Sequence, residues 1–151
     1  MNETLLYGLT ATHTRIHRCL ADLIDEEARR SPMAGLAPIV WQVGHLAWAD
    51  SSMARRVDGG SAAPDGYSDL FKTGTGGEAA YPPLAEVKEV LDRAQQSLEA
   101  VARSADPTTP LEARNYGNVG EMLVFASYHR GYHMGKMTTL RALLKKPRLF
   151  G

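Results

Sequence analysis

Two histidines, His129 and His133, lie four residues apart in a run of mostly apolar residues from Phe125 to Leu140. An α-helix completes one turn in about 3.6 residues, so both imidazoles are expected on one helical face, one above the other. Histidines at this spacing can direct two nitrogens at a single cation, as they do on other metal-binding helices. Two ligands leave a metal site incomplete, and a third ligand must come from elsewhere in the chain.

His45 is the candidate for the third ligand. It lies in a segment predicted to be helical from Pro38 to Val57, and no charged residue precedes it in that segment. Trp41 and Trp48 are expected on the same helical face. Metal sites in helical bundles are built from side chains on facing helices, and three histidine ligands leave a coordination position open to water or substrate. The competing interpretation is that all three are hydrogen-bonded histidines of the core.

The residues around these histidines give two further expectations. Gly44, Gly131 and Gly135 adjoin the histidines in the sequence and are expected to let the backbones approach closely. Carboxylates are scarce there, because the nearest one, Glu121, lies two turns before His129 at the start of the predicted helix and is expected in solvent. No catalytic residue is therefore assigned.

Four other side chains could take part in chemistry, and the sequence leaves their roles open. His13 and His17 repeat the four-residue spacing, but no acidic or cysteine residue accompanies them in a recognisable pattern. They could bind a second metal, relay protons beside the main site, hydrogen-bond to a ligand or bound water, or belong to the core. Cys19 fits a small buried hydrophobic residue. Lys136, one turn beyond His133, could contact an anionic substrate or extend to solvent.

The spacing of apolar residues predicts four helices and no strands. A glycine-rich connection from Asp58 to Pro82 contains Tyr67, Leu70 and Phe71, which are expected to pack onto the domain. Together these elements predict an all-α four-helix bundle in one domain covering residues 1–151, with long connections compatible with a crossover topology. The predicted helices extend from about Asn2 to Arg30, from Pro38 to Val57, from Pro83 to Ser104 and from Asn118 to about Lys145.

The composition argues against several classes of function. Lys plus Arg and Asp plus Glu number 17 each among 151 residues, so nothing indicates attraction to nucleic acid or to an anionic membrane surface. The single cysteine excludes an internal disulfide and fits a reducing compartment. The first residues lack the pattern of a signal peptide, and the least polar segment, from Leu36 to Ala49, is too short to span a bilayer. A soluble cytoplasmic protein is expected.

Two motifs resemble the DinB/YfiT-like superfamily. The segment from Trp41 to Ala47, Trp-Gln-Val-Gly-His-Leu-Ala, resembles its second-helix signature. The segment from Tyr128 to Lys136, Tyr-His-Arg-Gly-Tyr-His-Met-Gly-Lys, resembles its last-helix signature. The resemblance covers nearly the whole chain in helix order and length. It implies a crossed four-helix bundle of DinB/YfiT type, often a homodimer, that holds a metal through three histidines. The positions that match those ligands are His45, His129 and His133.

The resemblance also implies metal-dependent catalysis. Characterised relatives include thiol-dependent S-transferases and a mycothiol-dependent isomerase, and many others are described as metal-dependent hydrolases. The expected cofactor is a divalent metal ion, with zinc or nickel the first choices, in a site that activates a thiol or water toward a small-molecule substrate. Lys136 stands where relatives often carry glutamine, and the family pattern does not include His13 or His17.

Transfer involving a low-molecular-weight thiol is favoured over hydrolysis, by analogy with the family and because few carboxylates are present to act as a general base. The alternative belongs to another class of function. It is a non-catalytic helical module, metal-stabilised or metal-free, that acts in a stress response or through dimerisation.

Overall fold

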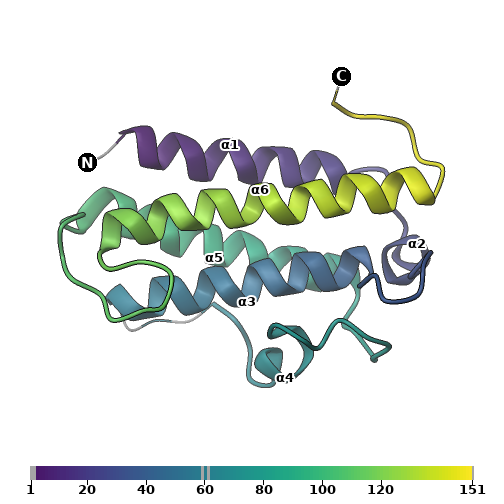
Figure 1. The fold of residues 1–151 in the computed structure, drawn as a ribbon, viewed down its shortest axis with the longest axis horizontal. Coiled ribbons are helices and arrows are strands. Elements are labelled where there is room, and N and C mark those ends of the chain that lie inside the picture. Colours follow the sequence, from purple (N-terminus) through teal and green to yellow (C-terminus); the bar gives the residue numbers. More distant parts are fainter. Residues whose placement is uncertain (1–2, 59, 61, 151) are drawn as a thin grey trace.

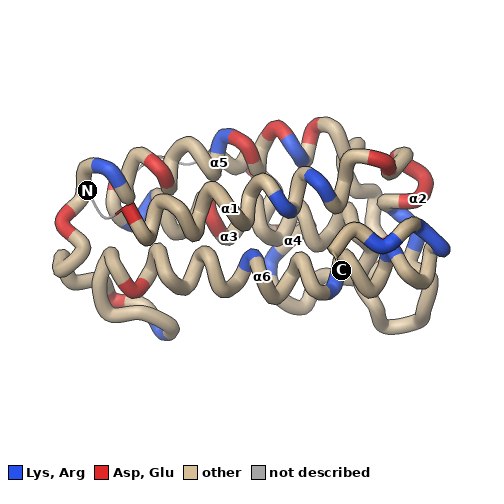
Figure 2. The backbone as a smooth tube through the Cα atoms, turned by 90° about the horizontal axis from the view of Figure 1, so that it is seen from above, with Lys and Arg blue, Asp and Glu red and all other residues tan. Residues whose placement is uncertain are grey.

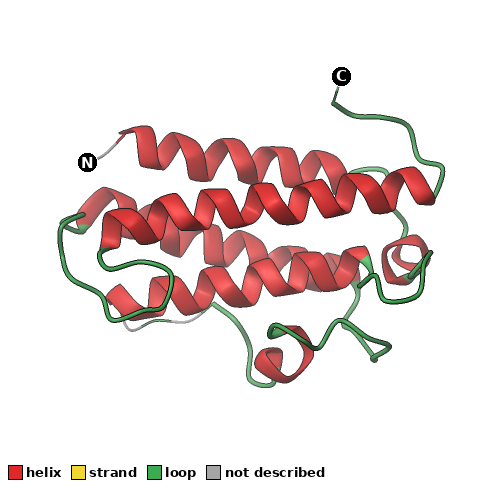
Figure 3. Ribbon diagram, in the orientation of Figure 1, coloured by secondary structure: helices red, strands yellow, loops and turns green. Residues whose placement is uncertain are grey.

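The computed structural model describes residues 3–58, 60 and 62–150, so Asn2, the predicted start of the first helix, lies outside the described residues. The described residues form helices and loops without a strand (Figure 3), which confirms the all-α fold. None of these helices is long and apolar enough to cross a bilayer. In chain order they are α1 (Glu3–Leu20), α2 (Asp25–Arg29), α3 (Ile39–Asp58), α4 (Tyr67–Phe71), α5 (Leu84–Ser104) and α6 (Val119–Leu143).

The four long helices form a bundle in which α1 and α3 occupy opposite corners (Figure 1). Helix α1 packs against α5 and α6, and α3 packs against the same two helices. In Figure 1, α1 and α6 run in one direction, and α3 and α5 run in the other. Because α3 and α5 are parallel neighbours, the chain between them must return along the length of the bundle. That connection supplies the predicted crossover and explains why it is long.

The first predicted helix, from Asn2 to Arg30, is wrong in one respect, because a break separates α1 from α2. The last carbonyls of a helix have no partners within it. Here Arg141 of α6 donates to the Cys19 carbonyl at 2.8 Å and to the Asp22 carboxylate. A partner 122 residues away in sequence thus stabilises a helix end that local periodicity does not reveal.

The connection between α3 and α5 covers the bundle through α4. Tyr67 and Phe71 are buried, and Leu70 is partly buried against the same apolar cluster, as predicted. Phe71 lies on α3 at Gly44, where a Cβ atom would come within 2.2 Å of the Phe71 ring. The missing side chain of Gly44 therefore allows α4 to sit directly on the helix that carries His45.

A layer of buried polar side chains lies between two apolar clusters of the core. Arg130 of α6 is fully buried and contacts Asp50 of α3 at 2.7 and 2.8 Å. The same guanidinium donates to the Leu9 carbonyl of α1 at 3.0 Å and to the Gln95 side chain of α5. One arginine thus joins all four long helices. Local residue spacing does not predict this network, because its members come from four different helices.

Candidate metal centre

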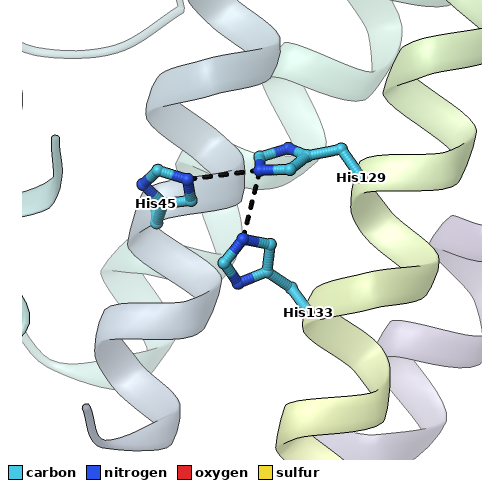
Figure 4. A group of neighbouring side chains, drawn as sticks. All are labelled: His45, His129 and His133. Carbon is cyan, nitrogen blue, oxygen red and sulfur yellow. Dashed lines mark hydrogen bonds between the residues drawn. The ribbon is translucent and has the colours of Figure 1, made fainter. Parts of the chain in front are cut away.

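His45 of α3 and His129 and His133 of α6 point toward one another across the contact between the two helices (Figure 4). The Nε2 atom of His129 lies 3.3 Å from Nε2 of His45 and 3.1 Å from Nε2 of His133. His45 and His133 are buried, and His129 is half-buried. The structure therefore brings together the three histidines that the sequence singled out, in a group that could hold a metal ion.

Hydrogen bonds to the opposite ring nitrogens fix the tautomers of two of these histidines. Nδ1 of His45 donates to the Phe71 carbonyl at 2.6 Å, so this nitrogen carries the proton. Nδ1 of His133 lies 2.6 Å from Oε1 of Gln42. The Gln42 amide nitrogen donates to the Ala37 carbonyl at 3.1 Å, and this bond orients the amide oxygen toward the histidine. When neutral, both imidazoles therefore present an unprotonated Nε2 to the third histidine.

The three converging nitrogens fit a metal ion better than a hydrogen-bonded cluster. Two of them carry lone pairs, and His129 has at most one hydrogen on Nε2 to share between them. Nitrogens around a tetrahedral zinc with Zn–N bonds of about 2.0–2.1 Å are about 3.3–3.4 Å apart. The distances of 3.1 and 3.3 Å are close to this value. Histidines that bind metals also commonly donate their other N–H to an oxygen, as His45 and His133 do.

Burial keeps the three imidazoles neutral at pH 7. Desolvation, followed by the neighbouring histidines and Lys136, lowers the pKa of His133 from 6.5 to about 3. Desolvation together with His45 and Arg130 lowers the pKa of His129 to about 4. Desolvation is also the main cause that lowers the pKa of His45. Because a metal ion binds only an unprotonated nitrogen, protons compete little for these ligands at neutral pH.

A cleft of about 850 Å³ is lined in part by Trp41, Gln42 and Lys136 but not by the three histidines themselves. Trp41 stacks on His45 with ring centroids 4.8 Å apart, and Gln42 is the hydrogen-bond partner of His133. The cleft therefore reaches the residues that support two of the three histidines. A small molecule bound there would contact the residues that support His45 and His133.

Lys136 is a half-buried cation at the edge of this cleft. Its ammonium group lies 4.5 Å from the centroid of the Tyr132 ring, a cation–π contact. The positive charge also contributes to the lowered pKa values of His45 and His133. Within the part of the chain that the structure describes, no carboxylate forms an ion pair with this lysine.

The glycines beside the histidines serve a narrower purpose than predicted. Gly44 allows the close contact with Phe71 of α4. At Gly131 and Gly135 a Cβ atom would meet no atom within 4 Å that belongs to a neighbouring element. The prediction that these two bring the helices together is wrong, because a Cβ atom at either position would lie in open space.

His13 and His17 form a separate cluster with a carboxylate of α5. Nε2 of His17 lies 2.6 Å, and Nε2 of His13 lies 3.0 Å, from the same Oδ1 atom of Asp92. Desolvation and the charge of Arg130 lower the pKa of His13 to about 4. Asp92 is 75 residues from His17 in sequence, so a search for local motifs could not find this acidic partner. Cys19, on the same helix, is a free and buried thiol.

The residues from Leu9 to Met137 match the DinB superfamily, and the chain belongs to this superfamily. Among solved structures, the fold is similar to the crystal structure of a conserved protein from Enterococcus faecalis, with a TM-score of 0.71 and 14% sequence identity. The similarity covers 96% of this chain and 97% of the other. At such low identity it shows the fold alone. No curated protein matches the chain. The predicted family and fold class are thus confirmed.

Proposed function

We propose that this protein is a metal-dependent enzyme in which His45, His129 and His133 hold one divalent metal ion. The convergence of three Nε2 atoms carries the proposal, because Phe71 and Gln42 hold two of them in the tautomer that a ligand needs. A divalent ion with three protein ligands keeps a position for a further ligand and lowers the pKa of a thiol or water bound there. Zinc and nickel are the leading ions, since both accept imidazole ligands.

Thiol transfer is favoured over hydrolysis because no carboxylate of the described residues contributes to the pKa shifts of the three histidines, including Glu78, which lines the adjoining cleft. The charged groups that shift the pKa values of the three histidines are other histidines, Arg130 and Lys136. Asp50 is engaged by Arg130. Glu121 is exposed, and its carboxylate accepts from the backbone N–H of Gly117 at 2.7 Å. A thiol, with a pKa of about 8.5 against about 15.7 for water, needs less assistance to lose its proton.

The substrate is assigned to the cleft beside Trp41 and Lys136. The Trp41 ring offers an apolar surface, and its Nε1 donates to the Thr75 hydroxyl at 3.2 Å, which restrains its orientation. Lys136 supplies a positive charge that no carboxylate of the described residues neutralises by an ion pair. A thiol or substrate that carries a carboxylate or another anionic group fits this combination.

Metal analysis of protein purified without a His tag tests the site. His45→Ala, His129→Ala and His133→Ala are each expected to lower the metal content by one equivalent per chain, while circular dichroism shows an intact helical fold. Ser127→Ala, on α6 but outside the site, is the control and should keep the wild-type content. Unchanged metal content in all three histidine variants would refute the site.

Thiol titrations of the cobalt-substituted protein test the reaction class. Both 3-mercaptopropionate and 2-mercaptoethanol are expected to produce a sulfur-to-cobalt charge-transfer band. Lys136→Met should weaken binding of 3-mercaptopropionate, which carries a carboxylate, and leave 2-mercaptoethanol unaffected. The absence of a band with either thiol would favour water activation, and equal weakening of both would remove the role given to Lys136.

A non-catalytic dimerisation module is the second candidate, and an exposed apolar face supports it. Val124, Tyr128 and Tyr132 lie four residues apart along α6, so they share one face of that helix, and each is more than half exposed. Helices α1 and α6 pack against each other, and few charged residues lie along α6 (Figure 2). A second copy of the chain could cover this face. Analytical ultracentrifugation of Tyr128→Glu should then show a monomer in place of a dimer, whereas thiol binding at the cobalt site would favour the enzyme.

A further inference from the structure

The contact between α1 and α5 contains a second group of potential metal ligands. His13 and His17 lie one turn apart on α1, with ring centroids 4.6 Å apart. Both direct Nε2 at Oδ1 of Asp92, and one ligand atom from each residue lies within 4.8 Å of the other two. We propose that His13, His17 and Asp92 form a second site for a divalent transition-metal ion. This site does not depend on the function proposed for the three-histidine centre.

The chemistry of the three groups suits such an ion. Two imidazole nitrogens and a carboxylate oxygen bind zinc, iron(II) and nickel, and the carboxylate adds a negative charge that the three-histidine centre lacks. The side chains of His13, His17 and Asp92 are 18%, 32% and 42% exposed, so water can occupy the remaining coordination positions. The ligand is therefore a partly hydrated cation that can exchange with solvent.

Without a metal, the Asp92 carboxylate lies 3.0 Å from Nε2 of His13 and accepts its proton there. Nδ1 of His13 is buried and has no hydrogen-bond partner among the described residues. When a cation binds Nε2, the proton of the neutral ring lies on Nδ1, and coordination to the cation takes the place of the hydrogen bond to Asp92. In a cluster held by hydrogen bonds alone, both histidines would instead have to donate to one carboxylate oxygen.

The buried Arg130 fixes the two helices that supply these ligands. It donates to the Leu9 carbonyl, one turn before the first histidine of the cluster, and to Gln95, three residues after the carboxylate. Its positive charge is paired with Asp50 but still lowers the pKa of His13, and the Asp92 carboxylate acts in the opposite direction. Ligands on helices that are held together in this way keep a defined geometry, which favours metal binding.

Calorimetric titration of zinc into the full-length, metal-free protein without a tag tests the second site. The wild-type chain is expected to bind two zinc ions. Asp92→Asn, which keeps the shape but removes the charge, should bind one, and so should the double variant His13→Ala/His17→Ala. Glu89→Gln removes the same charge from an exposed position of α5 and should still bind two. Circular dichroism checks that each variant is folded.

His129→Ala distinguishes the two sites. It should abolish binding of the zinc ion at the three-histidine centre and leave the zinc ion that requires Asp92. If Asp92→Asn still binds two ions, the cluster is held by hydrogen bonds and the proposal is wrong. The proposal is equally wrong if the wild type binds one ion that His129→Ala removes. A single equivalent that depends on Asp92 and not on His129 would support the second site and contradict the three-histidine centre.

Discussion

At the scale of single residues, two oxygen atoms of different origin orient the buried histidines. A backbone carbonyl, that of Phe71, accepts from His45, and a side-chain amide, that of Gln42, accepts from His133. Such bonds decide which nitrogen faces the ion and make the ligand more basic. Only the second bond can be removed by a side-chain substitution, so Gln42 is the position at which this support can be measured.

Gln42→Ala is expected to lower zinc affinity by about 10- to 100-fold, because the His133 ring loses the bond that fixes its tautomer. Competition with a chromophoric chelator measures the change. Gln96→Ala removes the same side chain from an exposed position of α5 and should leave the affinity unchanged. If both variants bind zinc as the wild type does, Gln42 does not orient the ligand.

The lowered pKa values predict how stability depends on pH. His129 and His133 remain neutral in the folded, metal-free protein down to about pH 4 and about pH 3, whereas the unfolded chain takes up these protons near pH 6.5. Between about pH 6.5 and pH 4 the unfolded state binds more protons, so the free energy of unfolding falls as the pH is lowered. Urea denaturation in the presence of a chelator at pH 7.5 and pH 5 measures this fall.

The double variant His129→Gln/His133→Gln should lose less stability over the same pH interval, because two of the groups responsible are absent. His13, with a pKa of about 4, accounts for part of the fall that remains. An equal loss in the variant and the wild type would show that the two ligand histidines are not kept neutral by folding.

The ligand histidines and their partners differ in how far the sequence could predict them. The ligand pair His129 and His133 follows from local helical spacing. The Gln42 partner of His133 does not follow from local spacing, because 91 residues separate the two. The Phe71 carbonyl and Asp92 do not follow from it either, because they reach their histidines from 26 and 75 residues away. Such partners are decided by packing, which periodicity does not encode.

At the scale of elements, α4 connects the segment between α3 and α5 to the proposed metal centre. The Phe71 ring packs on Gly44, and the carbonyl of the same residue holds His45. The sequence predicted that this segment packs onto the domain, because Tyr67, Leu70 and Phe71 are apolar. It gave no indication that the contact also orients His45, a proposed metal ligand.

Gly44→Ala places a methyl group 2.2 Å from a Phe71 ring atom. Overpacking of this kind costs about 1–3 kcal/mol, and moving Phe71 would also disturb the carbonyl that holds His45. Thermal stability and zinc affinity should therefore fall together. Gly131→Ala is the matched control, since its Cβ meets open space and alanine is favoured in a helix by about 0.5–1 kcal/mol. A stable Gly44→Ala protein with normal zinc affinity would count against the role of α4.

The ends of the helices show the same limit of local prediction. Helices α3, α5 and α6 begin and end within one or two residues of the predicted positions, because amphipathic spacing, Pro38 and Asn118 mark them. The break after α1 was missed. The Cys19 carbonyl at the end of α1 accepts from Arg141, which comes from the last turn of α6.

At the scale of the whole molecule, the Arg130 network lies between the two apolar clusters and joins all four long helices. The guanidinium and the Asp50 carboxylate are both fully buried. Burial raises the pKa of Asp50, and Arg130 opposes that rise. A buried pair of this kind fixes the relative positions of helices, and breaking it leaves a charge without compensation.

Asp50→Ala is expected to destabilise the protein by about 3–5 kcal/mol, because Arg130 stays buried without its partner. Denaturant unfolding measures the loss. The double variant Asp50→Leu/Arg130→Met removes both charges and should recover most of it. A loss below about 1 kcal/mol for the single variant would show that water or another group compensates the arginine, contrary to the buried pair described above.

Anomalous X-ray diffraction from crystals of the zinc-loaded protein, recorded on both sides of the zinc absorption edge, tests the three-histidine centre most directly. The prediction is an anomalous peak at about 2.0–2.1 Å from Nε2 of each of His45, His129 and His133. Zinc bound elsewhere on the chain, with no peak between these three nitrogens, would contradict it.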